Sequence, residues 1–217
     1  MKLTFDNFDE DLNDENENDY DLDVIMNHEY CDPYLFFNLN QDHINEYKKY
    51  VDNIDPHDWW EDRYDFTDEK NRVIEDYRNV LVHNAENDSV IARVGKQMFE
   101  ESNDNNFDYD VDNDACEFQV LKYGEGGNYK WHCDYGSSKY ADQGYTRKLS
   151  MSINISDPSE YKGGSLELID YCNRSAYLPK HSGSGVVFDS RLPHRATSVV
   201  KGTRIVLVAW MSGPPLR

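Results

Sequence analysis

From residue 117 to its end, the chain consists of short segments typical of β-strands, and this pattern restricts the fold more than any other feature. The segments are β-branched or alternate apolar with polar residues, and clusters of Gly, Pro, Asp and Asn separate them. They read EFQVLKY, KLSMSINIS, GSLELID, GSGVVFD and TRIVLVAW. Such a series indicates a sandwich or a barrel, and the jelly roll is the obvious closed form.

The residues before this region favour helices. Residues 41–54 place apolar side chains on one helical face, and residues 71–85 show the same periodicity. A third helix is expected to begin after Asn87 or Asp88 as its N-cap. Because helices come first and strands follow, we predict an α+β fold in which N-terminal helices buttress one side of a β-core.

Charge is distributed unevenly along the chain, whose net charge is −20. Residues 1–117 hold 9 Lys and Arg against 34 Asp and Glu, and residues 118–217 hold 13 against 8, so the two parts carry −25 and +5. Binding to nucleic-acid phosphates depends on Lys and Arg. Nucleic acid is therefore not expected as a partner, whereas the basic surplus of the second part suits a small anionic ligand.

An acidic segment precedes the expected domain. Residues 6–23 contain ten acidic residues and no basic one, and a segment of this composition buries little. We therefore expect residues 1–23 to form a disordered tail and residues 24–217 to form a single domain. Within that domain, helical support is expected over 24–116 and the jelly-roll core over 117–217.

Features of export and membrane insertion are missing from the sequence. No apolar run approaches the roughly 18–20 residues needed to cross a bilayer, and the first residues lack the apolar segment of a signal peptide. The four cysteines form no C-x-x-C pair, so neither a disulfide framework nor a zinc knuckle is indicated. The expectation is a cytoplasmic protein without a membrane partner.

A potential metal site lies in the β-type region. His132 and Asp134 are two residues apart, and side chains at this spacing in a strand point to the same side. His194, between two strand-like runs, offers a third ligand. Two His and one carboxylate form the facial triad that binds Fe(II) and leaves positions open, although zinc can use the same ligands.

Arg204 begins the apolar segment RIVLVAW, ten residues after His194. An arginine that faces the interior needs an anionic partner, and its planar fork fits a carboxylate. A strand-end arginine that reaches solvent is the alternative. These two readings remain open on the residue alone.

Taken together, these residues resemble a known family. Tyr123, His132-x-Asp134, His194 and Arg204, in this order and at these intervals, look like the prolyl 4-hydroxylase-like branch of the Fe(II)/2-oxoglutarate dioxygenases. The resemblance covers about residues 87–213 and includes FQVLKYGEGGNYKWHCD and GSGVVFDSRLPHRATSVVKGTRIVLVAW. The family fold is a double-stranded β-helix of the jelly-roll type, which agrees with the strand pattern.

The resemblance assigns roles to individual positions. It makes His132, Asp134 and His194 the iron ligands and, with Arg204, the catalytic set. It assigns the distal carboxylate of 2-oxoglutarate to Arg204, with the Tyr123 hydroxyl as a second contact. Further residues are expected around the pocket, on the co-substrate side Ser152 and Trp210 and on the substrate side Tyr129 and Asn154. Simple core packing is an equal reading for Trp210, and Asn154 stands where some relatives have a second co-substrate tyrosine.

The activity implied is hydroxylation of a C–H bond with conversion of 2-oxoglutarate to succinate and CO2. Fe(II) is the implied cofactor, O2 the oxidant, and ascorbate a candidate reductant. A protein or peptide is the expected substrate, with proline the leading residue. Two alternatives stay open, a dioxygenase of a free amino acid or other small molecule and a catalytically silent binding module.

Overall fold

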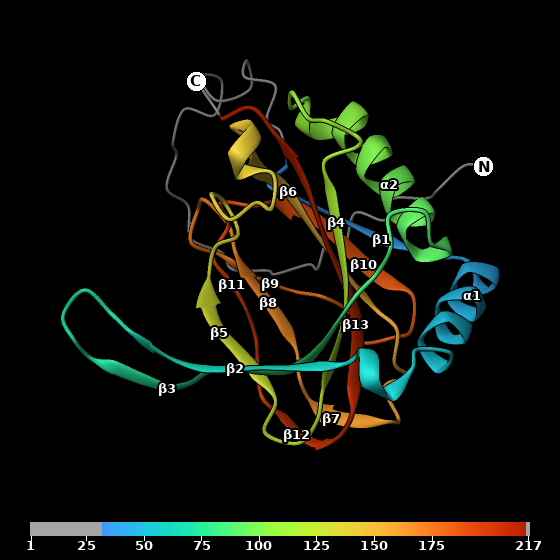
Figure 1. Cartoon of the computed structure of the whole chain (residues 1–217), viewed down its shortest axis with the longest axis vertical. Helices are drawn as coiled ribbons and strands as arrows, with labels where there is room; N and C mark the ends of the chain where they lie inside the picture. Colours follow the sequence, from blue (N-terminus) through green and yellow to red (C-terminus); the bar gives the residue numbers. More distant parts are fainter. Residues whose placement is uncertain (1–31, 216–217) are drawn as a thin grey trace, which may run out of the picture.

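The computed structural model describes residues 32–215 of the chain, so the acidic tail expected over residues 1–23 lies outside the described residues. Two α-helices cover one side of a strongly curved β-sheet (Figure 1). The helices are α1 (Gln41–Asp52) and α2 (Val90–Ser102), and α2 continues into a π-helical turn at Asn103–Phe107. Short 3-10 turns occupy Pro56–Asp58 and Ala141–Gln143.

The strands before residue 133 are β1 (Tyr34–Asn38), β2 (Trp60–Thr67), β3 (Val73–Asn84), β4 (Cys116–Tyr123) and β5 (Asn128–His132). Those that follow are β6 (Thr146–Asn154), β7 (Tyr161–Gly163), β8 (Leu166–Ile169), β9 (Ser175–Tyr177), β10 (Ser184–Asp189), β11 (His194–Ala196), β12 (Val199–Gly202) and β13 (Arg204–Gly213).

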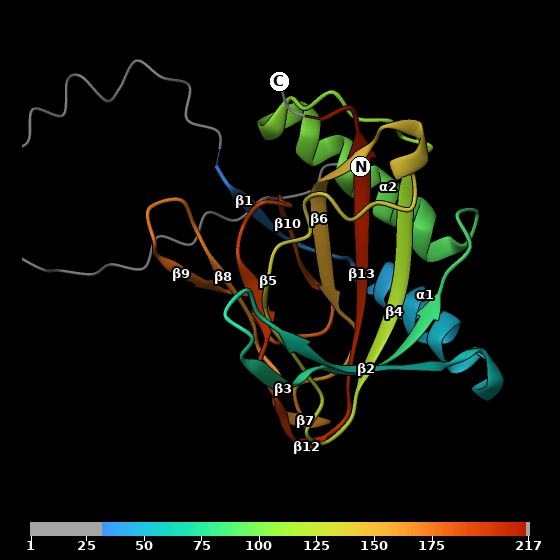
Figure 2. The same ribbon diagram turned by 60° about the vertical axis from the view of Figure 1, so that its left-hand side comes forward.

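All strand pairs are antiparallel, and the main sheet has the order β1-β10-β6-β13-β4-β3-β5-β11-β8-β9, with β2 paired to β3. Strand β3 pairs with β4 through residues 81–84 and with β5 through Arg78 and Asn79. It therefore joins the wall that carries β4, β13 and β6 to the wall that carries β5, β11 and β8. The result is a curled half-barrel, closed at one end by the β7–β12 pair (Figure 2).

The principal core lies between the helices and the wall formed by β6, β13 and β4. Each helix starts at a polar cap, since the Asn40 side chain accepts from the His43 amide and the Ser89 side chain from the Ala92 amide. Both helices turn an apolar face to the sheet. The largest fully buried side chains of this core include Tyr47, Ile91, Phe99, Leu149, Met151, Leu207 and Met211.

Most of the expected elements are confirmed. The helix expected over 41–54 is α1, and the third helix is α2, although its N-cap is Ser89 and not Asn87 or Asp88. The five β-type segments correspond to β4, β6, β8, β10 and β13. The part expected to be helical support also supplies β1, β2 and β3 to the main sheet, and the division of the chain into tail and domain stays a prediction.

The helix predicted over 71–85 is wrong, because this segment forms strand β3 and part of a long hairpin with β2. Its apolar residues fit both periods over a short window. In the strand, Val80 and Val82 are buried on one side while Leu81 between them is 38% exposed. Val73 and Ile74, which the helical pattern placed inward, are exposed near the end of the hairpin.

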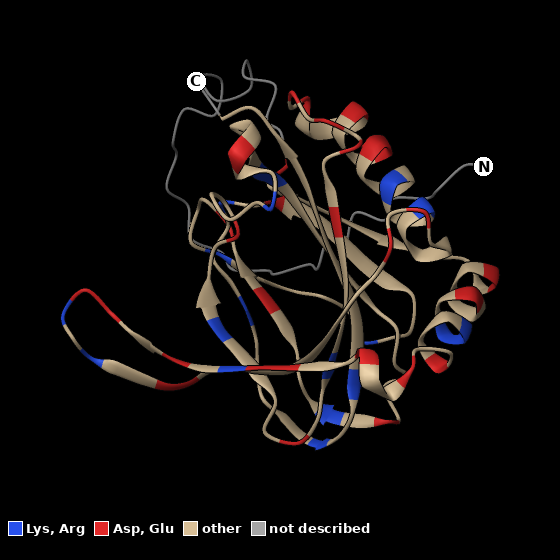
Figure 3. Ribbon diagram, viewed as in Figure 1, with Lys and Arg blue, Asp and Glu red and all other residues tan. Residues whose placement is uncertain are grey.

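Acidic and basic residues both occur on the helices and on the β2–β3 hairpin, and β7 and β12 at the closed end carry lysines (Figure 3). Among residues 32–215, neither helix is long and apolar enough to cross a membrane.

Candidate metal centre and its pocket

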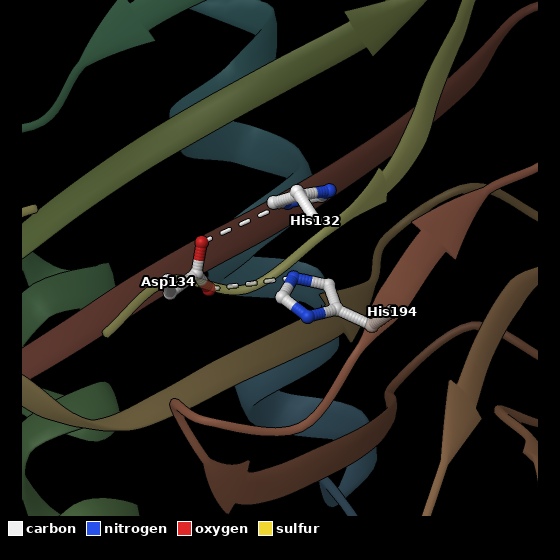
Figure 4. A group of neighbouring side chains, drawn as sticks. All are labelled: His132, Asp134 and His194. Atoms are coloured by element: carbon white, nitrogen blue, oxygen red, sulfur yellow. Dashed lines mark ion pairs between the residues drawn. The ribbon is translucent and has the colours of Figure 1, made fainter. Parts of the chain in front are cut away.

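Three potential metal ligands meet inside the curve of the sheet (Figure 4). His132 ends β5 and lies opposite His194, the first residue of β11, in the strand register. Asp134 follows β5, and its amide donates to the Ser190 carbonyl at 2.9 Å. One ligand atom from each of the three side chains lies within 4.8 Å of the others. The strand pairing therefore brings together residues 62 positions apart in the sequence.

Backbone carbonyls fix the orientation of both imidazoles. His132 Nδ1 lies 2.8 Å from the Lys130 carbonyl, and His194 Nδ1 lies 3.0 Å from the Leu192 carbonyl. A carbonyl accepts a hydrogen bond, so each Nδ1 carries a proton and each Nε2 is directed to the centre. Burial opposes protonation of His194, but the Asp134 carboxylate, with Oδ2 at 3.4 Å from Nε2, outweighs it and raises the pKa of His194. Burial, reinforced by the neighbouring His194, lowers the pKa of His132 to about 3 and keeps it neutral.

The Asp134 carboxylate is held by two donors. Trp210 Nε1 donates to Oδ2 at 2.7 Å, and the Ser150 hydroxyl donates to the same oxygen at 2.8 Å. Oδ1 remains directed toward His132 Nε2, at 3.7 Å. Burial opposes ionisation, but His194, His132 and the Trp210 donor outweigh it and hold the pKa of Asp134 below its usual range. The side chain is therefore an ionised carboxylate.

Aromatic rings enclose the two histidines. The Tyr129 ring stacks on His132 with centroids 3.5 Å apart, and Phe188 meets His194 edge-on at 4.8 Å. The Arg78 guanidinium lies 4.5 Å from the Tyr129 centroid, and Arg78 pairs with Asp62 across the hairpin. The His132 side of the centre is thus built partly from β2 and β3.

A buried arginine occupies the same cavity as the three ligands. Arg204 is 3% exposed and lies opposite Tyr123 in the β13–β4 register. Burial lowers the pKa of Arg204, although Tyr161 and Tyr123 oppose the shift. Its polar contacts in the described part of the chain are neutral, with Nε donating to Asn154 Oδ1 at 3.2 Å. The reading of Arg204 as a strand-end residue that reaches solvent is therefore wrong.

The cavity brings together most of the residues expected from the sequence. Its lining includes the three ligands and Tyr123, Tyr129, Ser152, Arg204 and Trp210. Asn154, expected on the substrate side, is not among the lining residues and instead lies behind Arg204. Apolar side chains that include Leu166, Val206 and Val208 complete the wall.

Two polar residues at the site were missed in the sequence. Arg78 was hidden by the helical reading of its segment, although strand parity with Val80 and Val82 gives it their inward direction. The Tyr161 hydroxyl donates a hydrogen bond to Asn154 Oδ1 at 3.3 Å. Tyr161 directly precedes a Lys-Gly-Gly turn, and no neighbouring residue in the sequence indicates this contact.

The ligand set fits a divalent metal. Two imidazoles and one carboxylate, with no fourth protein ligand in the group among residues 32–215, match the facial arrangement of Fe(II) sites that leave positions open to other ligands. A donor set of this type is also chemically acceptable to zinc. The buried Arg204 guanidinium lines the same cavity, and a metal site by itself does not need such a cation.

Comparisons with known proteins agree with this geometry. Residues 118–212 match the family model of the 2OG-Fe(II) oxygenase superfamily. A PKHD-type hydroxylase from Thermosynechococcus vestitus is 34% identical over 90 residues, which cover 42% of this chain and 40% of the relative. A PKHD-type hydroxylase from Hyphomonas neptunium is 36% identical over 89 residues, which cover 41% and 39%. The chain therefore aligns with less than half of the length of these relatives.

Solved structures with the same fold extend over more of the chain. A prolyl-4-hydroxylase from Pseudomonas putida has a TM-score of 0.64 at 15% identity, covering 89% of this chain and 97% of that one. A prolyl hydroxylase from Trichoplax adhaerens, in complex with a hypoxia inducible factor oxygen degradation domain peptide fragment, has a TM-score of 0.60 at 14% identity. That alignment covers 82% of this chain and 83% of the other. At such identities the likeness shows a common fold.

Proposed function

We propose that this chain, which carries an oxygenase domain of the 2OG-Fe(II) superfamily similar to the prolyl hydroxylases, hydroxylates a C–H bond of a peptidyl residue. Proline is the leading candidate for that residue. Iron(II) is the metal of this superfamily, with 2-oxoglutarate and O2 as co-substrates. The proposed reaction releases succinate and CO2, and ascorbate is the proposed reductant.

One observation carries the proposal, namely that a His-Asp-His group and a buried arginine with neutral partners share one cavity. His132, Asp134 and His194 would hold the iron. Arg204 would bind the distal carboxylate of 2-oxoglutarate, because a guanidinium fork matches a carboxylate in charge and geometry. Tyr123, opposite Arg204 in the register, would donate a hydrogen bond from its hydroxyl to that carboxylate.

When bound, the iron would supply the oxidative chemistry on O2, while the protein positions the reactants and excludes water. Trp210 and Ser150 keep the Asp134 carboxylate in one orientation through their hydrogen bonds. Apolar side chains, Leu166 and Phe188 among them, line the cavity around the histidines. Such a lining favours a C–H bond over water next to the metal.

The β2–β3 hairpin supports a peptide as the substrate, because it projects from the body of the molecule beside the site (Figure 1). Tyr64 and Phe66 on its surface are 40% and 43% exposed. Both pack on Tyr77, whose ring centroid lies 5.8 Å from that of Tyr129, the residue stacked on His132. Aromatic rows of this kind are suited to extended proline-containing segments.

We also propose that the complete fold of the domain is a jelly roll. The half-barrel has one wall with β10, β6 and β13 and another with β5, β11 and β8, and the triad lies between them. This arrangement fits a double-stranded β-helix of the jelly-roll type with helices on one side.

The test is to incubate the iron-loaded full chain with 2-oxoglutarate, O2 and a panel of peptides, and to seek a gain of one oxygen by mass spectrometry. Oxidation of a proline-containing peptide with an equal yield of succinate is expected. Oxidation confined to free amino acids or other small molecules would favour the small-molecule dioxygenase. An iron-loaded chain that yields no succinate with any substrate would favour the silent binding module.

A further inference from the structure

The amide of Asn154 has only one possible orientation. Its nitrogen lies 2.9 Å from the Ser156 carbonyl, 2.7 Å from the Lys180 carbonyl and 3.5 Å from the His181 carbonyl. An amide nitrogen donates whereas an amide oxygen accepts, so three carbonyls identify the group that faces them as the nitrogen. The side chain is 1% exposed, and its Oδ1 must point to the opposite side.

On that side, Oδ1 accepts two hydrogen bonds. Arg204 Nε donates to it at 3.2 Å, and the Tyr161 hydroxyl donates to it at 3.3 Å. The stem of Arg204 is also confined, because a Cβ added at Gly164 would lie 3.1 Å from Arg204 Cδ, and Gly164 has a φ of +58°. The direction of the guanidinium is therefore fixed by groups outside the cavity.

We propose that Asn154, assisted by Tyr161, is a positioning residue that directs the Arg204 guanidinium into the cavity and leaves its positive charge uncompensated. This inference rests on the proposed function, in which Arg204 binds the distal carboxylate of 2-oxoglutarate. Asn154 then acts through Arg204 and touches neither the co-substrate nor the metal.

The neutrality of Asn154 is the important property. An Asp at this position would accept from Arg204 Nε and compensate the charge that the co-substrate needs. Its second oxygen would also lose the hydrogen bonds that the Asn154 nitrogen donates to three carbonyls, so the fold of this variant is checked with its affinities. The pair would be buried, where a carboxylate and a guanidinium interact strongly. A neutral acceptor holds the arginine in place without competing with the bound carboxylate.

The test compares two 2-oxo acids that differ only in the distal carboxylate. Binding of 2-oxoglutarate and of 2-oxopentanoate to the Mn(II)-loaded full chain is measured by calorimetry, with the weaker acid measured by competition. In Asn154→Asp, the affinity for 2-oxoglutarate is expected to fall roughly tenfold or more, as when a buried charged contact is lost. The affinity for 2-oxopentanoate is expected to stay the same, because this acid makes no contact with Arg204.

Two further variants separate positioning from folding. Tyr161→Phe removes one hydroxyl from the cluster and is expected to reduce the 2-oxoglutarate affinity by a smaller factor while the fold is kept. Asn128→Asp is the matched control, since Asn128 is also buried, at 4% exposure, and lies on β5 outside the cavity lining. It introduces the same buried charge and is expected to leave both affinities unchanged.

The outcomes are distinguishable. Equal weakening of both acids in Asn154→Asp would mean a general structural effect and would overturn the inference. Unchanged 2-oxoglutarate affinity in folded Asn154→Asp and in Tyr161→Phe would also overturn it, while the proposed function would stand. If the unaltered chain bound 2-oxoglutarate no better than 2-oxopentanoate, the assignment of Arg204 would fail and the inference with it.

Discussion

The Trp210 indole donates a hydrogen bond of 2.7 Å from Nε1 to Oδ2 of Asp134. The two residues are 76 positions apart, and the bond joins β13 to the loop after β5. It leaves Oδ1 of the carboxylate directed at the neighbouring histidine. Trp210 is therefore part of the candidate metal site as well as a buried residue of the wall.

Trp210→Phe is expected to weaken metal binding roughly ten- to a hundredfold, the usual effect of losing a hydrogen-bond partner of a metal ligand. Phenylalanine keeps an aromatic ring but lacks the donor, so Asp134 is left with the Ser150 hydroxyl. Competition between the protein and a fluorescent chelator for Mn(II) measures the change. Trp131→Phe, which alters a tryptophan that packs on Arg195, is the control and should bind metal normally. Equal affinities for all three proteins would show that the indole only packs.

Loss of any ligand should abolish iron-dependent turnover of 2-oxoglutarate. His132→Ala, Asp134→Ala and His194→Ala each remove one of three converging ligand atoms. Succinate release and the melting temperature should be measured together, since the fold is expected to persist. Cys133→Ser is a stringent control because this exposed cysteine lies between two ligands and is absent from the cavity lining. Full activity in Asp134→Ala would exclude the triad.

Arg204→Ala should weaken 2-oxoglutarate binding by about 2–5 kcal/mol, roughly thirtyfold to several-thousandfold. Arg204→Lys should be affected less, because it keeps the charge and loses only the bidentate fork. Metal affinity should be almost unchanged in both. Titration of 2-oxoglutarate into anaerobic iron-loaded protein, followed by charge-transfer absorption, measures the effect, with the exposed Arg174→Ala as control. Unaltered affinity in Arg204→Ala would place the anchor elsewhere.

The double variant Tyr64→Ala and Phe66→Ala should raise the KM for peptide substrates while peptide-independent 2-oxoglutarate turnover stays unchanged. These side chains are exposed and pack on Tyr77, and neither contacts a metal ligand directly, although the Tyr64 hydroxyl also reaches Tyr129. Steady-state kinetics with a proline-containing peptide provides the measurement. Val73→Ala, on the same hairpin and 62% exposed, is the control. An unchanged KM for the peptide in the double variant would show that the hairpin does not contact the substrate.

Gly185→Ala should destabilise the fold by about 1–3 kcal/mol, the usual cost of overpacking a core. A Cβ at this position would lie 2.3 Å from the Phe37 ring, and Gly185 and Phe37 are register partners on β10 and β1. Chemical denaturation gives the free energy of unfolding. Gly124→Ala is the matched control, because an added Cβ there meets nothing within 4 Å. Equal stability of the two variants would mean that β1 is not tightly held.

The sequence by itself determined the elements whose signals are local. Strand alternation and turn residues identified β4, β6, β8, β10 and β13, and helical periodicity identified α1 and α2. Spacing placed His132 and Asp134 on one side of a strand, and the resemblance to a known family joined His194 and Arg204 to them. The strand, helix and His-x-Asp patterns depend on near neighbours in the chain, so they can be recognised without knowledge of the fold.

Only the tertiary structure decided which distant groups meet. The segment with Val80 and Val82 fits a helix or a strand over its short length, and pairing with β2, β4 and β5 selects the strand. The contacts of Trp210 with Asp134 and of Asn154 with Arg204 link residues 76 and 50 positions apart. Such hydrogen bonds depend on the register of strands across the sheet, which no local pattern specifies, because each strand edge offers the same backbone groups to any partner.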